Sequence, residues 1–142
     1  NSMYYIQAGM KNNTLKFGVY LYYLFLLVLL ILYLYPGSII GYFIYGDFGT
    51  QPNLLKNPLG TSINHFLIFF LITSLGFIYN SIKVKFANSF FFLFSLSIFL
   101  ELTHLFVPNR AFELNDILAN STGVVVVYLL FLGRKKFLNE KI

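Results

Sequence analysis

Residues 17–35 form the first of several long runs that contain almost only apolar side chains and no charge. As an α-helix with a rise of about 1.5 Å per residue, this run is about 28 Å long, close to the thickness of about 30 Å of a bilayer's hydrocarbon core. The whole chain is 58% hydrophobic and 11% charged, whereas soluble proteins contain about 25% charged residues. The sequence therefore predicts an all-α integral membrane protein.

Further apolar runs follow the first one, and we expect a single domain over residues 1–142. The expected transmembrane helices are 17–35, 63–82, 86–106 and 114–133. Pro36-Gly37 ends the first run because proline cannot continue the helical hydrogen-bond ladder. The connection 38–62 mixes aromatic and aliphatic residues with a turn region, so we expect an interfacial segment between the first two helices.

The basic residues indicate an orientation. With the amino terminus inside, eight of the ten basic residues fall on the inner side and only Lys56 and Arg110 on the outer side. The inner residues are Lys11, Lys16, Lys83, Lys85, Arg134, Lys135, Lys136 and Lys141. Because short cytoplasmic segments carry an excess of Lys and Arg, we expect both termini in the cytoplasm.

Ionisable residues gather at 101–120, where two apolar runs meet. Charged groups at membrane depth are costly and are functional candidates by default. Glu101 and His104 share one face of the third predicted helix, and Asp116 and Asn120 share one face of the fourth. Because a short connection makes these helices antiparallel neighbours, we expect the two polar faces to meet on the extracytoplasmic side.

Arg110 lies at the tip of this hairpin. Its planar fork suits either a bridge to Glu101 or Asp116 or the binding of an external anion, so the cluster is either a structural clamp or a binding site. His65, at the mouth of the second helix, either completes the cluster or anchors the helix at the interface. The candidate ligand-binding residues are His65, Glu101, His104, Arg110, Asp116 and Asn120.

Other classes of site are disfavoured. The chain has no cysteine, which excludes disulfides and thiolate chemistry, and no nucleic-acid surface is indicated. The Glu101-x-x-His104 spacing occurs in carboxylate-bridged metal bundles, but these need a second such motif and further glutamates. We therefore expect no metal and no cofactor, and we assign no catalytic residue.

The stretch 98–123 resembles the signature of the VanZ-like membrane proteins, which is roughly E-x-x-Q-x-F-x-P-x-R-x-x-x-x-x-D-x-x-x-N-x-x-G. The matching residues are Glu101, Phe106, Pro108, Arg110, Asp116, Asn120 and Gly123. Leu34-Tyr-Pro36, the loop 53–58 and His65 resemble the family more loosely. His104 replaces the family glutamine, Thr61 and Ser62 replace an aspartate and a lysine, and Phe69 replaces a tyrosine.

The resemblance implies a four-helix protein of the bacterial cytoplasmic (inner) membrane, in a family named for its association with low-level resistance to the glycopeptide teicoplanin. It directs the polar cleft towards cell-envelope lipids or similar amphiphiles, so we expect a protein that binds membrane lipids by their headgroups. The alternative is a small accessory subunit of a larger membrane complex, with other membrane subunits as partners. An enzyme acting on a lipid-linked substrate, with Glu101 or His104 as general base, is the least favoured of the three.

Overall fold

A computed structural model describes residues 2–52, 60, 62–78 and 89–139, with the side chains of 2–12 and 138–139 left out. The described residues form helices and no strand, which confirms the all-α class. The helices are α1 (Ser2–Leu34), α2 (Ile39–Tyr45), α3 (Ser62–Ile78), α4 (Phe90–Thr103) and α5 (Leu114–Asn139).

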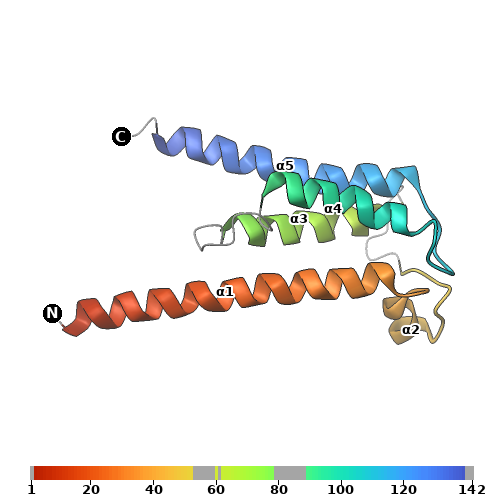
Figure 1. Ribbon diagram of the computed structural model, residues 1–142, viewed down its shortest axis with the longest axis horizontal. Helices are drawn as coiled ribbons and strands as arrows, with labels where there is room; N and C mark the ends of the chain where they lie inside the picture. The colour runs from red at the N-terminus through yellow and green to blue at the C-terminus, as the bar shows by residue number, and fades with distance from the viewer. Residues whose placement is uncertain (1, 53–59, 61, 79–88, 140–142) are drawn as a thin grey trace.

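The four longer helices lie side by side and alternate in direction along the chain (Figure 1). The start of α1 and the end of α5 lie at one end of the bundle, whereas α2 and the loop between α4 and α5 lie at the other. We call this second end the loop end. Helix α5 packs mainly on α3 and also on α4, and α1 contacts both α3 and α4.

The helix bounds differ from the predicted spans at several helix ends. Helix α1 begins at Ser2 rather than near residue 17, since the residues before 17 include good helix formers and no proline. Helix α4 ends at Thr103, before residue 106, because the following amides bond to carbonyls three residues back. Helix α5 continues through Gly133 to Asn139, as one helical glycine costs only about 1 kcal/mol.

Two helices contain segments that are long and apolar enough to cross a membrane, Asn13–Leu34 in α1 and Leu114–Phe137 in α5. Helices α3 and α4 are apolar but shorter, with 17 and 14 described residues. Helix α4 begins at Phe90 rather than near residue 86, because Ser89 is extended and its hydroxyl caps the helix by accepting from the Phe92 amide at 3.2 Å. The predicted end of the second span and the basic turn at Lys83 and Lys85 lie outside the described residues.

The segment after α1 folds back on itself at the loop end. The Ser38 hydroxyl caps α2 by accepting from the Gly41 amide at 2.9 Å, and the Ser38 amide donates to the Phe48 carbonyl at 2.6 Å. Asp47 accepts bonds from the Thr50 hydroxyl and the Gly49 amide, which lower the pKa of its carboxyl group. This folded loop covers one side of the polar residues described below.

The core is built from one side of each long helix. It consists of Tyr22, Leu29, Tyr33, Phe69, Ile72, Phe77, Leu93, Leu100, Val124 and Val127. The closest helix contact is at Gly123 of α5, where an added Cβ would lie 2.7 Å from the Phe66 carbonyl oxygen and 3.0 Å from the Phe70 nitrogen of α3. A glycine is therefore needed for α5 to lie this close to α3, as is common where small residues let membrane helices approach.

Alanine at Gly123 should destabilise the fold by about 1–3 kcal/mol, because the added methyl group meets backbone rather than a side chain that can turn away. Gly133, also in α5, has nothing within 4 Å of an added Cβ. The same substitution there should leave stability unchanged or raise it by up to about 1 kcal/mol. Thermal unfolding in detergent, followed by circular dichroism, compares the two variants. Equal melting temperatures would contradict the close contact of α3 and α5.

Candidate functional site

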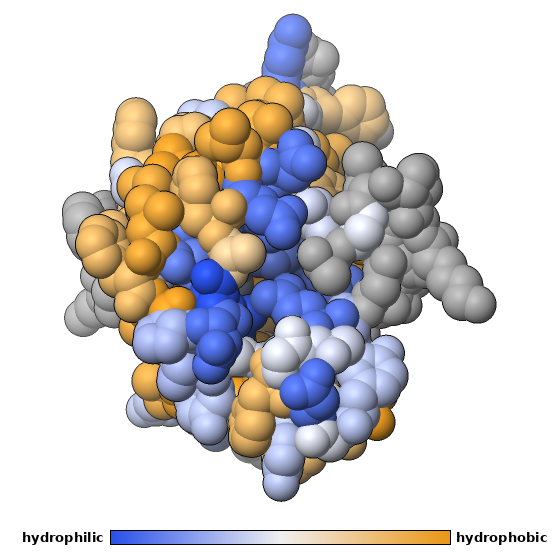
Figure 2. All heavy atoms as spheres, turned by 90° about the vertical axis from the view of Figure 1, so that its right-hand side faces the viewer, coloured by the Kyte–Doolittle hydropathy of each residue, from blue (hydrophilic) through white to orange (hydrophobic). Residues whose placement is uncertain are grey.

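Most buried polar side chains of the described residues gather near the loop end of the bundle. His65 is 8% exposed, Asp116 is 5% exposed, and Glu101 and Asn120 are fully buried. Figure 2 looks onto this end and shows hydrophilic residues gathered in the middle of the face, with hydrophobic residues around part of it. The cluster therefore lies just beneath a polar surface while its helices are otherwise apolar.

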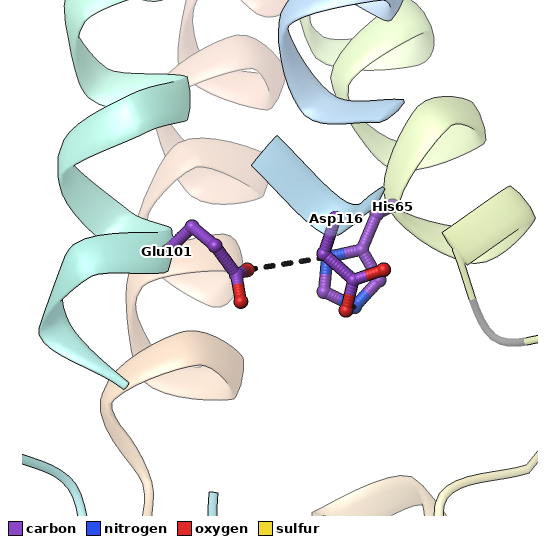
Figure 3. Close-up of side chains that lie close together, drawn as sticks. All are labelled: His65, Glu101 and Asp116. Atoms are coloured by element: carbon purple, nitrogen blue, oxygen red, sulfur yellow. Dashed lines mark ion pairs between the residues drawn. The ribbon is translucent and has the colours of Figure 1, made fainter. Parts of the chain in front are cut away.

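His65, in the first turn of α3, stands between the two acids. Its Nε2 lies 3.3 Å from Asp116 Oδ2, and its Nδ1 lies 3.7 Å from Glu101 Oε2. Figure 3 shows the three side chains pointing toward one another from α3, α4 and α5. Of the two alternatives for His65, the structure thus supports membership of the cluster.

Tyr33 of α1 connects this group to Asn120. Its hydroxyl group lies 2.8 Å from His65 Nδ1 and donates to Asn120 Oδ1 at 2.8 Å. The Asn120 amide nitrogen donates to the Ser97 carbonyl at 3.3 Å, which sets the orientation of the amide. Tyr33 of the first predicted span was not singled out from the sequence, because tyrosine is common near the ends of membrane spans. The available signal was its position near the end of that span, at the depth of His65.

These bonds determine where protons lie. Tyr33 has one hydroxyl proton, which goes to Asn120, so its oxygen accepts a hydrogen bond from His65 Nδ1. The other ring nitrogen of His65 then faces the carboxylate of Asp116. Two lone pairs at this distance repel each other, so the arrangement requires a proton or another cation between His65 and Asp116.

The remaining oxygens of the two acids are held by neighbours. Asp116 Oδ1 accepts from the Ser62 hydroxyl at 2.5 Å. Glu101 Oε1 lies 3.1 Å from His104 Nδ1 and accepts from the Glu113 amide at 3.3 Å. By contrast, Glu101 Oε2 is buried and has no hydrogen-bond partner among the described residues.

His104 follows the last turn of α4 and is 3% exposed. Its ring stacks on that of Tyr33, with centroids 5.3 Å apart and planes 15° apart. Its Nδ1 pairs with Glu101, and its Nε2 is buried without a partner among the described residues. His104 therefore contacts Glu101 through Nδ1 and stacks on Tyr33, and its Nε2 is left to bind another group.

Arg110 occupies a different position from the rest. Its NH2 group donates to the Leu32 carbonyl at 2.5 Å and its Nε to the Tyr35 carbonyl at 3.4 Å, at the carboxyl end of α1. No ion pair joins it to Glu101 or Asp116 among the described residues. Burial lowers the pKa of Arg110, and the neighbouring Tyr33 and Glu101 act against this shift. Its charge also suits the negative end of the α1 dipole.

Two small cavities adjoin the cluster. One, of about 70 Å³, is lined by His65, His104, Arg110, Ser38 and Gln51 and by apolar side chains such as Leu32, Ile39 and Ile68; we call it the polar cavity after its polar residues. The other, of about 220 Å³, also borders His104, Ser38 and Gln51, and it reaches Asp116. The cluster is therefore accessible from two sides at the loop end.

An apolar groove begins next to the smaller polar cavity, and Leu32 and Ile68 line both. The groove runs between α1 and α3 and has a volume of about 460 Å³. Its lining is almost entirely apolar, from Phe25, Val28, Leu29, Leu32, Ile68, Leu71, Ile72 and Leu75. The polar cavity and the apolar groove therefore share the wall that Leu32 and Ile68 form.

The structure brings five of the six predicted site residues into one connected group: His65, Glu101, His104, Asp116 and Asn120. Arg110 borders the same cavity from the end of α1. Comparison with known proteins adds nothing to this geometry, because no family model, curated protein or solved structure matches the chain.

Proposed function

We propose that the chain is a VanZ-like, four-span protein of the bacterial cytoplasmic membrane that binds the polar headgroup of a cell-envelope lipid or similar amphiphile. The observation that carries this proposal is the shared wall between the polar cavity at His65 and Arg110 and the apolar groove between α1 and α3. An amphiphile likewise has a polar headgroup joined to an apolar chain.

Several features support the membrane placement. Only 28% of each candidate span in α1 and α5 is buried, whereas the core helix of a soluble domain is mostly buried. Large apolar side chains such as Phe91 and Phe99 of α4 are 79% and 60% exposed, which suits contact with lipid tails. In the proposal, α3 and α4 belong to the second and third spans, which the sequence predicts at 63–82 and 86–106.

The orientation rests on the charges and on the arrangement of the helices. The start of α1 and the end of α5 lie at the same end of the bundle, and α5 carries Arg134, Lys135 and Lys136 there. By the positive-inside rule this end is cytoplasmic. The loop end, with the polar cluster, then faces outwards.

Size and chemistry agree with an amphiphile. The groove falls within the range of about 300–1,000 Å³ that is typical of ligand sites, and its lining suits an acyl chain. Arg110 uses two of its donor groups on α1 and also lines the polar cavity. Its charge there suits an anionic group such as a phosphate.

The alternative is an accessory subunit of a larger membrane complex. Exposed aromatic residues at the loop end, Phe43 at 81% and Phe106 at 87%, favour it because they lie outside the four long helices. Stoichiometric co-purification with another membrane protein, together with failure to retain lipid, would support this alternative.

Cysteine labelling tests the topology, since the natural chain has no cysteine. Ala111, which is exposed in the loop between α4 and α5, and Lys135, which is exposed near the end of α5, are each replaced by cysteine. A membrane-impermeant maleimide should label Ala111→Cys in intact spheroplasts and Lys135→Cys only after permeabilisation. The reverse pattern would overturn the orientation, and labelling of both from outside would overturn α5 as a membrane span.

Binding by the groove is tested with a matched pair of substitutions. Leu71 in the groove and Leu129 on the outer face of α5 are both 59% exposed. Leu71→Trp should fill the groove and weaken retention of dioleoyl phosphatidylglycerol about tenfold, equivalent to about 1.4 kcal/mol, whereas Leu129→Trp should not. Native mass spectrometry in detergent measures the bound lipid. Equal retention by both variants would contradict the groove as the site.

Arg110 variants separate the clamp from the binding role. Arg110→Ala should lower stability by about 1.5–3 kcal/mol per lost charged hydrogen bond and should remove any preference for phosphatidylglycerol over phosphatidylcholine. Arg110→Lys keeps the charge but not the planar fork, so it should lose stability and keep the preference. Thermal unfolding and lipid retention report the two effects. If Arg110→Ala lost only stability, Arg110 would be a structural clamp alone.

A further inference from the structure

His65 and Asp116 each hold one polar atom to another side chain and turn a second atom toward each other. His65 Nδ1 is bonded to Tyr33 at 2.8 Å, and its Nε2 faces Asp116. Asp116 Oδ1 is bonded to Ser62 at 2.5 Å, and its Oδ2 lies 3.3 Å from His65 Nε2. Histidine and carboxylate ligands of metal ions characteristically have outer hydrogen bonds of this kind, which orient them.

Glu101 repeats the pattern from α4. Its Oε1 contacts His104 and the amide of Glu113, while its Oε2 lies 3.7 Å from His65 Nδ1 and has no hydrogen-bond partner among the described residues. A fully buried carboxylate oxygen without a partner is expensive. It is therefore an independent sign that something else binds at this point.

We propose that His65, Glu101 and Asp116 bind a divalent transition-metal ion, for which Zn²⁺ is the best match. One donor atom from each residue can be chosen so that all three lie within 4.8 Å of one another. Nitrogen and oxygen donors suit zinc, and three protein ligands leave a fourth position for water or another oxygen ligand. The ion would neutralise both acids and occupy the place where His65 and Asp116 require a cation.

The fit needs the three side chains to draw together. Zinc bonds to nitrogen and oxygen are about 2.0–2.2 Å long, so ligand atoms at tetrahedral angles around one ion are about 3.3–3.6 Å apart. The most widely separated donor atoms would therefore move closer by about 1 Å, through rotation of the carboxylate groups. The cavity of about 220 Å³ that borders Asp116 and His104 provides a route from the loop end.

The sequence pattern pointed away from a metal because it was judged along one helix, where Glu101-x-x-His104 has no second copy. The proposed ligand set instead takes one residue from each of α3, α4 and α5. The competing arrangement is a doubly protonated His65, whose positive charge would also satisfy Asp116. This proposal stands independently of lipid binding, because the ion is measured without any lipid probe.

The test uses the full chain in detergent with a histidine-free affinity tag. Protein stripped with EDTA is refilled with Zn²⁺, desalted and assayed by inductively coupled plasma mass spectrometry, and affinity is measured by competition with a fluorescent zinc chelator. We expect one zinc per chain. Asp116→Asn and His65→Gln should weaken binding by at least about 100-fold, and Tyr33→Phe by about 10–100-fold through the lost outer bond.

Asp47→Asn is the matched control, because it makes the same change at an exposed carboxylate that borders none of the cavities described above. It should bind zinc like the natural chain. Thermal unfolding gives a second measurement: zinc should raise the melting temperature of the natural chain and of Asp47→Asn, but not that of Asp116→Asn.

Two results would overturn the proposal. In the first, the natural chain retains no zinc and gains no thermal stability from it, which favours the protonated His65. In the second, His65→Gln and Asp116→Asn bind zinc as well as the natural chain does, which places the ion elsewhere. If these ligand variants fail to fold, the natural chain and the milder Tyr33→Phe variant decide the question.

Discussion

Glu101 and Asp116 are carboxylates buried within a bundle of apolar helices. The arrangement of the surrounding helices depends on supplying these two groups with hydrogen bonds and a compensating charge. Moving an ionised carboxylate out of water costs several kcal/mol unless charge and hydrogen bonds compensate. No single helix supplies enough partners. His65 and Ser62 of α3 contact the acids directly, while Tyr33 of α1 joins His65 to Asn120 of α5. The network around the acids therefore connects all four long helices at one depth.

This polar junction depends in turn on close packing elsewhere. Gly123 lets α5 lie against the backbone of α3 at Phe66 and Phe70. Asp116 lies about two turns before Gly123 on α5, and His65 directly precedes Phe66 on α3. The contact between the helices thus sets the spacing between the acid and the ring. A glycine with no chemical role of its own becomes part of the site through geometry.

The position of α1 connects the polar junction to the apolar groove. Tyr33 and Arg110 hold the carboxyl end of this helix, one from inside the cluster and the other from the loop above it. Leu32, beside Tyr33, lies in the wall that the polar cavity and the groove share. In the proposed function, the end of α1 therefore contacts both the headgroup and the acyl chain of the bound amphiphile.

The apolar runs by themselves determined the helical class and the approximate positions of the long helices, because a sequence this poor in charge and interrupted by Pro36-Gly37 has few other ways to satisfy its backbone. Helical spacing also determined that Glu101 and His104, and likewise Asp116 and Asn120, share faces. The inclusion of Tyr33, the central place of His65 and the attachment of Arg110 to α1 were decided only by the tertiary structure. These contacts join residues far apart in the chain, and local periodicity carries no information about which helices lie side by side or how far each is rotated.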